Sequence, residues 1–339
     1  MRPIKARISI DAMAHNLRVA RSHAGTACVF AVVKANAYGH GLSRALRALA
    51  AADGLAVLTL EEAANLRLMG VEKPILLLEG IFGADEIATC AELDLWPVLH
   101  QAVHLDWLQQ QPPARPLQVF LKFDSGMHRL GFPLADHAAV VARVRSLPGV
   151  AGITLMTHFA QADEAAGVDW QLQPFLREMA GHDLTWSSAN SAALLRYPET
   201  LGAWVRPGIM LYGASPFAEV SAEQLGLRPA MTLQSEIISV QTLQAGEGGG
   251  LRPAVSRRTR DAGGGGGLRL CGRLSASRVD GHPGAGQRLC QPNPGSGVDG
   301  HAVRGPQRVR RCRGRQPGGV VGGGAAGGWG GRSCRHQQL

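Results

Sequence analysis

The sequence predicts an α/β protein in which residues 1–247 form a (β/α)₈ barrel of the TIM type. Strand-like and helical segments alternate along this stretch. Most of the strand-like segments are short apolar runs, which is typical of strands buried on both faces of a parallel sheet. Polar side chains follow several of these runs, at the position where such a barrel places its active site. A doubly wound open sheet has the same order of elements and remains the alternative.

The elements are expected in a regular order along the chain. Ala6–Ile10 alternates like a strand, and Asp11 is expected to cap a helix over Ala12–Ser22. The runs that predict the barrel strands are Cys28–Val33, Leu55–Leu60, Pro74–Leu78, Trp96–Leu99, Gln118–Phe123, Gly152–Met156, Leu184–Ser187 and Val205–Leu211. Helical patterns are found over Leu42–Ala51, Glu61–Met69, Ala84–Glu92, Val103–Gln110 and Leu134–Leu147.

Lys34 is the first candidate functional residue. It ends the buried run Cys28–Val33 and is followed by a turn rich in small residues and glycine, which leads into the helix from Leu42. Burial at a strand end removes water from the amine and lowers its pKa. An amine in that state forms a Schiff base readily with a carbonyl compound. The alternative is a lysine whose amine simply reaches the surface from a strand end.

Other polar residues follow later strands at equivalent positions. They are Lys122 and Arg129 after the fifth, His158 after the sixth, Asn190 and Ser191 after the seventh, and Arg206, Gly208 and Ile209 on the eighth. Taken singly, each has a structural explanation: Arg129 as a surface ion pair, His158 as a core histidine, Asn190 and Ser191 as a helix cap. Taken together, they suit a phosphorylated aldehyde. Ser191 and the backbone near Gly208 would hold the phosphate, and Arg129 would bind a substrate carboxylate.

The tail from residue 248 has a different composition from the rest of the chain. Residues 248–339 hold 16 Arg and no Lys against three Asp and no Glu, a net charge of +13, whereas residues 1–247 have a net charge of −4. The tail also contains 26 of the 44 glycines, and its four cysteines lack the spacing of a metal site. With few large apolar residues and little strand alternation, it is not expected to fold natively.

Five motifs in order make residues 1–247 resemble the barrel domain of alanine racemase, an enzyme that uses pyridoxal 5'-phosphate (PLP). The motifs are AVVKANAYGHG, LKFDSGMHRLGF, LMTHFA, SSANSAA and VRPGIMLYG. The resemblance implies interconversion of L-alanine and D-alanine in a homodimer. The first residues lack the apolar core of a signal peptide, so a cytoplasmic protein is expected. No metal, membrane or nucleic acid is expected to take part, and no apolar run is long enough to span a membrane. A non-racemising PLP-binding barrel protein is the alternative function.

The resemblance also assigns roles to individual residues. It implies that Lys34 carries PLP as an internal aldimine and takes the Cα proton of D-alanine. Arg129 would contact the phenolic oxygen of the cofactor and the substrate, and Lys122 matches a lysine that is carbamylated in some members. His158 would stack beside the pyridine ring, and Arg206 would meet its nitrogen. The expected phosphate contacts are Tyr38, Ser191, Gly208 and Ile209, with Asn190 beside them.

The chain departs from this family in its C-terminal part. The family has a β-domain there, which supplies a second base, a tyrosine in a GYADG motif, to the partner subunit. No tyrosine follows Tyr212 in this sequence. The tail could be an Arg/Gly-rich arm that binds nucleic acid, or an extension without a function. It could also be the product of a reading-frame shift.

The frameshift hypothesis can be examined with the genetic code. Codons permitted for Leu268–Ser277, read one base later, can encode Cys-Gly-Tyr-Ala-Asp-Gly-Tyr-Pro-Arg. The same shift lets Val298–Pro306 encode a stretch that contains Met-Asp-Met, a second motif of the family's β-domain. Both lie in one frame and in the family's order. We therefore expect a frameshift near Gly248–Leu251 and little or no racemisation by the chain as it stands.

Overall fold

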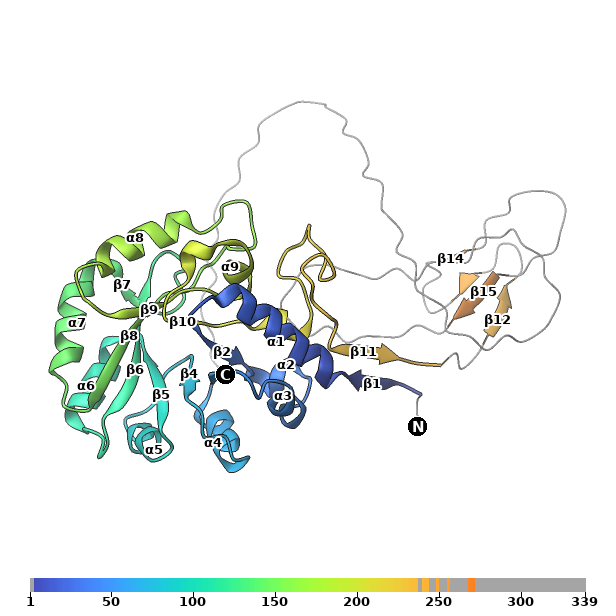
Figure 1. The fold of residues 1–339 in the computed structure, drawn as a ribbon. Helices are drawn as coiled ribbons and strands as arrows, with labels where there is room; N and C mark the ends of the chain where they lie inside the picture. Colours follow the sequence, from blue (N-terminus) through green and yellow to red (C-terminus); the bar gives the residue numbers. More distant parts are fainter. Residues whose placement is uncertain (1–2, 237–239, 244–247, 250–254, 257–267, 272–339) are drawn as a thin grey trace, which may run out of the picture. The chain divides into compact units, whose positions relative to one another are not determined.

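Eight parallel strands and the helices between them form a barrel in the computed structural model (Figure 1), which describes residues 3–236, 240–243, 248–249, 255–256 and 268–271. The neighbouring strands follow the order β10-β2-β3-β4-β5-β6-β8-β9. Their bounds are Cys28–Val32 (β2), Gly54–Val57 (β3), Ile75–Leu77 (β4), Leu95–Leu99 (β5), Leu117–Asp124 (β6), Val150–Met156 (β8), Thr185–Ser187 (β9) and Trp204–Val205 (β10).

Hydrogen bonds between residues in or beside β10 and β9, the first and last strands of this order, close the barrel. The amide of Ala203 donates to the carbonyl of Trp186, and the amide of Arg206 donates to that of Ala189. On the other side, β10 pairs with β2 in parallel. The predicted barrel is therefore confirmed, and the open doubly wound sheet is excluded.

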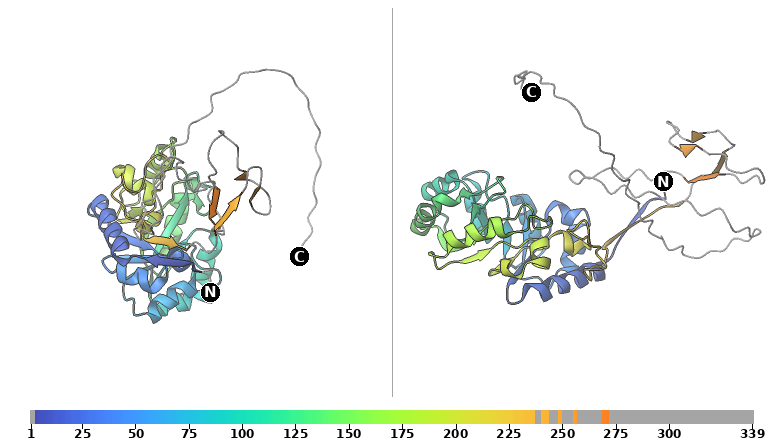
Figure 2. Two further views of the ribbon diagram at one scale, coloured as in Figure 1. Left: turned by 90° about the vertical axis from the view of Figure 1, so that its right-hand side faces the viewer. Right: turned by 90° about the horizontal axis from the view of Figure 1, so that it is seen from above.

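Helices cover the outside of the strands, as the further views in Figure 2 show. Their bounds are Ile10–Ala24 (α1), Lys34–Tyr38 (α2), Leu42–Ala48 (α3), Leu60–Leu68 (α4), Glu86–Glu92 (α5), Ala102–Gln110 (α6), His137–Ser146 (α7), Asp169–Met179 (α8) and Ser191–Arg196 (α9). Short 3₁₀ helices span Leu134–Asp136 (η1), Pro198–Thr200 (η2) and Ile209–Tyr212 (η3). Among the described residues, no helix is both long and apolar enough to cross a membrane.

Several short strands lie outside this parallel order. Phe132–Pro133 (β7) pairs with β6, and Lys5–Ile8 (β1) pairs antiparallel with Met231–Gln234 (β11). Val240–Leu243 (β12) pairs with Leu268–Cys271 (β15), and Gly248–Gly249 (β13) pairs with Val255–Ser256 (β14). Three of these strands were not expected from the composition of the tail. In β15 the residues Leu-Arg-Leu-Cys do alternate over a short span, as a strand requires. Most of the tail, including Val298–Pro306, lies outside the described residues.

Two local predictions are wrong. Helix α1 begins at Ile10 and its cap is Ser9, whose hydroxyl accepts a hydrogen bond from the Ala12 amide at 3.1 Å, so Asp11 lies within the first turn. The eighth barrel strand ends at Val205, before Pro207 and Gly208, because proline has no N–H for the ladder. The chain then turns into η3 rather than continuing as a strand to Leu211.

The interior of the barrel is filled with large apolar side chains. Phe30 lies at the centre, stacked on Trp204 with ring centroids 4.1 Å apart and edge-on to Trp96 and Phe120. Val32, Ala56, Leu76, Leu78, Val98 and Met156 complete this cluster, which we call the barrel floor. It closes the barrel below the carboxyl ends of the strands, as packed layers do in other barrels of this type.

Candidate active site

Four polar side chains form the layer directly above the barrel floor. Side chains on a strand alternate between the two faces of a sheet, so residues two apart point to the same side. Lys34, Lys122, His158 and Arg206 come two residues after the floor residues Val32, Phe120, Met156 and Trp204, respectively. These four residues were predicted from the sequence as site residues, and the strands bring them together.

Lys34 follows β2 and lies opposite an aromatic ring. Its Nζ is 5.9 Å from the centroid of the Tyr38 ring. Burial lowers the pKa of Lys34, and the charge of Arg129 lowers it further, whereas Glu79 and Glu62 raise it. The net shift is downward, as expected for a reactive amine at a buried strand end.

Lys122 is more deeply buried than Lys34, with 4% of its surface exposed. Burial, followed by the charges of Arg206 and Arg129, lowers the pKa of Lys122 to about 8. Arg129 is itself exposed, on the loop that follows β6. Because its charge lowers the pKa values of Lys34, Lys122 and His158, its guanidinium lies within electrostatic reach of all three.

Arg206 is almost fully buried and is held by hydrogen bonds. Its Nη1 donates to the Ser187 hydroxyl, and its Nη2 donates to the carbonyls of Thr157 at 2.8 Å and Ser188 at 3.2 Å. Burial lowers the pKa of Arg206 to about 9. Burial, with the charge of Arg206 next, also lowers the pKa of His158 well below its ordinary value. At neutral pH the histidine is therefore uncharged and the arginine is charged.

The expected phosphate contacts gather around the start of α9 and η3. Asn190 caps α9 by accepting from the Ala193 amide at 3.0 Å, and the Ser191 hydroxyl accepts from the amides of Gly208 at 2.8 Å and Met210 at 3.4 Å. A Cβ atom at Gly208 would lie 2.7 Å from the hydroxyl of Tyr38. Glycine thus leaves the space into which the Tyr38 hydroxyl fits. Ile209 opens η3, where the first N–H groups have no partner within the helix.

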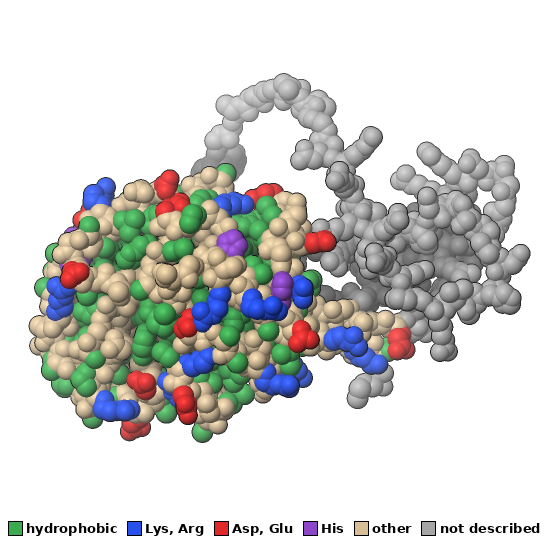
Figure 3. All heavy atoms as spheres, viewed as in Figure 1, with side chains coloured by type: hydrophobic (Ala, Val, Ile, Leu, Met, Phe, Trp, Pro, Cys, Tyr) green, Lys and Arg blue, Asp and Glu red, His purple; other side chains and the backbone are tan. Residues whose placement is uncertain are grey.

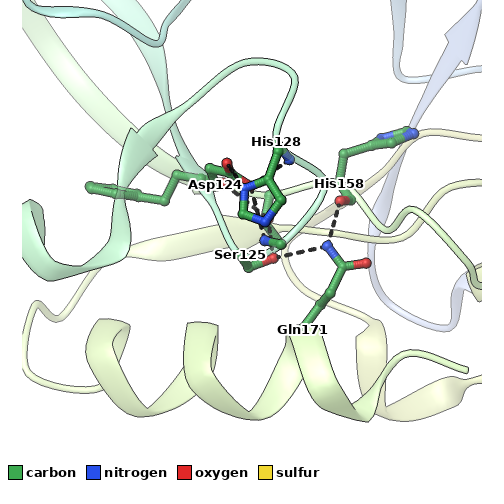
Figure 4. A network of polar contacts seen from close by, with 8 residues as sticks. Asp124, Ser125, His128, His158 and Gln171 are labelled. Carbon is green, nitrogen blue, oxygen red and sulfur yellow. Dashed lines mark hydrogen bonds and ion pairs between the residues drawn. The ribbon is translucent and has the colours of Figure 1, made fainter. Parts of the chain in front are cut away.

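The loop that carries Arg129 is fixed by Asp124 at the end of β6 (Figure 4). Its carboxylate accepts from the amides of Gly126 at 2.9 Å and His128 at 3.0 Å, and from the His128 ring at 2.9 Å. Burial alone would raise the pKa of Asp124, but these hydrogen bonds outweigh it and lower the pKa. Gly131 closes the loop with φ 133°, so close to the backbone of Asp124 that a Cβ atom would lie 2.6 Å from its nitrogen.

Gln171 on α8 joins this loop to the one that carries His158 (Figure 4). Its amide nitrogen donates to the Ser125 hydroxyl at 3.3 Å and to the His158 carbonyl at 3.2 Å, and its oxygen accepts from the Ala160 amide at 2.8 Å. The Thr157 hydroxyl donates to a backbone carbonyl, so it accepts from Ser125, 2.7 Å away. Every hydroxyl and amide in this buried network therefore has a partner.

Sequence reasoning missed Gln171 and Glu62, although each leaves a signal. Gln171 lies four residues before the buried Phe175, so a polar residue occupies the core stripe of an amphipathic helix. Glu62 is the fourth residue of Thr59-Leu-Glu-Glu, the pattern of a helix capping box. Its carboxylate instead accepts from the amide of Ala35, the residue directly after Lys34.

Most of the chain resembles known proteins. Residues 8–216 match the family described as alanine racemase, N-terminal domain. The alanine racemase of Thiobacillus denitrificans is 80% identical over 250 residues, which cover 74% of this chain and 68% of that protein. The alanine racemase of Pseudomonas entomophila is 45% identical over 288 residues, covering 84% and 78%.

Solved structures give the same result. The structure of the biosynthetic alanine racemase from Pseudomonas aeruginosa has a TM-score of 0.73 and 44% identity, covering 76% of this chain and 73% of that chain. The alanine racemase from Acinetobacter baumannii has a TM-score of 0.71 and 36% identity, with the same coverage. Both the fold and the sequence of the barrel therefore resemble those of these enzymes.

Proposed function

The chain belongs to the alanine racemase family, and we propose that its barrel binds PLP at Lys34 and serves the interconversion of L-alanine and D-alanine. The polar layer above the barrel floor is the observation that carries this proposal. It sets one lysine of lowered pKa among a neutral histidine, a second lysine and a buried arginine. Perturbed groups of this kind cluster at catalytic sites.

The phosphate end of PLP fits the groups around Gly208. The space that a Cβ atom would fill there is next to the Tyr38 hydroxyl, and the Ser191 hydroxyl and the first amides of η3 lie nearby. Hydroxyl and backbone N–H groups are the donors that bind phosphate in proteins. Tyr38, Ser191, Gly208 and Ile209 would hold the phosphate, with Asn190 fixing the start of α9.

The ring end of PLP fits Arg206 and His158. A guanidinium has five N–H donors, and the hydrogen bonds of Arg206 to described residues come from Nη1 and Nη2, which leaves its Nε–H for the ring nitrogen. The neutral His158 ring would pack beside the cofactor without adding a charge. When bound, PLP supplies the electron-withdrawing ring that makes the Cα proton of an amino acid acidic.

Lys34 would transfer the proton, and Arg129 would bind the substrate. The lowered pKa of Lys34 gives a larger share of neutral amine, which can take the Cα proton on the D-alanine side. The exposed guanidinium of Arg129 would bind the substrate carboxylate and the phenolic oxygen of the cofactor. The network of Gln171 and Asp124 would keep Arg129 and His158 in position.

Lys122 would act through Arg129. At a pKa of about 8, part of the Lys122 amine is neutral near physiological pH, and a neutral amine can form an N–C bond to carbon dioxide and release one proton to water. The resulting carbamate is an anion and would accept a hydrogen bond from Arg129. It would thereby replace the repulsion between two cations by an attraction.

The second base of the family has no counterpart in this chain, because no tyrosine follows Tyr212. With Lys34 as its one base, the chain would exchange the Cα proton on one face only and would racemise poorly. The chain as it stands would then be a racemase barrel without its second base, whereas the shifted GYADG and Met-Asp-Met motifs argue against a barrel that never had a β-domain.

We further propose that residues 248–339 are the remnant of the family's β-domain read in a shifted frame, and residues 1–247 the PLP-binding domain. About a quarter of this chain and about a third of the T. denitrificans enzyme lie outside their 80% identical match. Both chains thus carry residues that do not match, which is what a shifted frame produces. The homodimer expected for the family would lose a surface in this way.

Covalent trapping of PLP tests the proposed function. The full chain is incubated with PLP, reduced with borohydride and digested, and the modified peptide is identified by mass spectrometry. We expect modification at Lys34 and none in Lys34→Ala, with Lys5→Ala, which removes an exposed lysine, as the control. Equal trapping in Lys34→Ala would contradict the assignment.

A further inference from the structure

The five-residue element α2 is not an ordinary α-helix, because the backbone after Lys34 is left-handed. Ala35, Asn36, Ala37 and Tyr38 have φ angles of 53°, 52°, 55° and 52°. This left-handed region is unfavourable for residues with a side chain, and a run of four is rare because each contributes its own strain. The surrounding contacts must therefore hold the segment in place.

The carboxylate of Glu62 contacts the residue directly after Lys34. One oxygen accepts a hydrogen bond from the amide of Ala35 at 2.6 Å, and the other accepts from the amide of Leu58 at 2.9 Å. The Ala35 amide is bonded directly to the carbonyl carbon of Lys34. Leu58 follows β3, which pairs with β2. One carboxylate thus joins the carboxyl ends of two neighbouring strands at the point where Lys34 leaves the barrel wall.

Helix capping alone does not explain this arrangement. Thr59 caps α4 and accepts from the Glu62 amide at 3.3 Å, so the chain has the first half of a capping box. In the complete motif the glutamate side chain returns to the amide of the cap residue itself. Here both oxygens bond to other amides, and one of these belongs to a different βα loop. Hydrogen bonds to a charged acceptor are stronger than those between neutral groups, so the Glu62 carboxylate can offset part of the strain in the loop.

We propose that Glu62 is the positioning residue of the Lys34 amine. By holding the Ala35 amide it fixes the backbone from which the lysine side chain projects, and it adds a negative charge near the amine. This inference rests on the proposed role of Lys34. The charged groups that act on Lys34 are Arg129, Glu79 and Glu62, and Glu62 is the one that also bonds to the loop backbone.

Glu62→Gln tests the proposal with Glu61→Gln as the matched control. The glutamine side chain has the same size but one acceptor oxygen, so its NH₂ group would face one of the two donor amides. Glu61 is adjacent on α4 and exposed. For Glu62→Gln we expect PLP binding to weaken by about tenfold or more, the effect of losing a hydrogen bond to a charged group. Glu61→Gln is expected to bind as the unsubstituted chain does.

A second readout does not depend on the cofactor. The rate at which an anhydride acetylates Lys34 is measured against pH in the PLP-free chain. Loss of the Glu62 charge is expected to move the midpoint to lower pH in Glu62→Gln but not in Glu61→Gln. The proposal is overturned if the two variants give the same midpoint and the same PLP affinity.

If Glu62→Gln does not fold, amide hydrogen exchange in the unsubstituted chain tests the proposal instead. The amides of Ala35 and Leu58 should exchange slowly, because both are held by the carboxylate. Fast exchange at Ala35 would overturn the proposal. If the unsubstituted chain binds no PLP, the proposed function fails, whereas acetylation and exchange still decide the role of Glu62.

Discussion

At the scale of single residues, the site depends on the positions that alternate along four strands. Lys122 lies on β6, whereas Lys34, His158 and Arg206 follow the ends of β2, β8 and β10. Each of the four comes two residues after an apolar residue of the barrel floor. Because burial removes water from the charged forms of Lys34 and Lys122, their pKa values fall. The same burial keeps His158 neutral. Burial thus lowers the pKa values of three side chains.

Lys122 gives a prediction about stability and pH. The folded state holds the Lys122 amine at a pKa of about 8, below its ordinary value of 10.5, so the folded state binds the proton less tightly than the unfolded state does. The contribution of Lys122 to the free energy of unfolding therefore rises as the pH rises from about 8 to 10.5, and it is lowest below pH 8. Lys122→Met removes the group.

We expect the free energy of unfolding of Lys122→Met to exceed that of the parent by about 3 kcal/mol below pH 8, and the difference to shrink by pH 10. Urea unfolding of both chains across this range, without added bicarbonate, measures it. A difference that does not change with pH would show that the amine is not desolvated. Adding bicarbonate should stabilise the parent alone, if the amine is carbamylated.

At the scale of elements, polar side chains on the helices connect loops that follow different strands. Gln171 on α8 connects the loops that carry Arg129 and His158, and Glu62 on α4 connects those after β2 and β3. Glu62 bonds to backbone amides in both of its loops, whereas Gln171 bonds to the backbone of the His158 loop and to the Ser125 hydroxyl of the Arg129 loop. Loops of this kind are thereby held to the rigid part of the barrel, which a catalytic site requires.

Gln171→Leu tests the connection that Gln171 on α8 makes between the two loops. The leucine would leave the Ala160 amide, the His158 carbonyl and the Ser125 hydroxyl short of a partner in the interior, at a cost of about 1–3 kcal/mol for an unsatisfied group. We expect a lower melting temperature and weaker PLP binding. Gln173→Leu, an exposed position on the same helix, is the control and should change neither. If both variants melt alike, the network does not stabilise the loops.

The sequence was sufficient to predict the order of these elements but not the contacts between them. The apolar runs that ended in Val33, Leu78 and Leu99 became barrel strands, because short apolar segments between helices have few other ways to be buried. The cap of α1 was predicted wrongly, since Ser9 and Asp11 are both good cap residues and local sequence does not choose between them. Gln171 escaped notice because its partners are remote in the chain.

At the scale of the whole molecule, the chain joins two compositions. On the face of the molecule that Figure 3 shows, the acidic and basic side chains of the described residues are interspersed, as on an ordinary protein surface. The tail, by contrast, has a net charge of +13 and no tyrosine. The proposed frameshift would account for both features, because it would replace the residues of a β-domain by arginine and glycine without altering the barrel.

A comparison of reading frames is the most direct test of this account. The full chain and a version with one base removed from the codons near Gly248–Leu251 are supplied with PLP and L-alanine, and D-alanine is measured. We expect the corrected chain to racemise and the original to be slower by at least about a hundredfold, the contribution of one positioned base. Equal rates in the two chains would contradict the account, because the second base would then lie outside the missing β-domain.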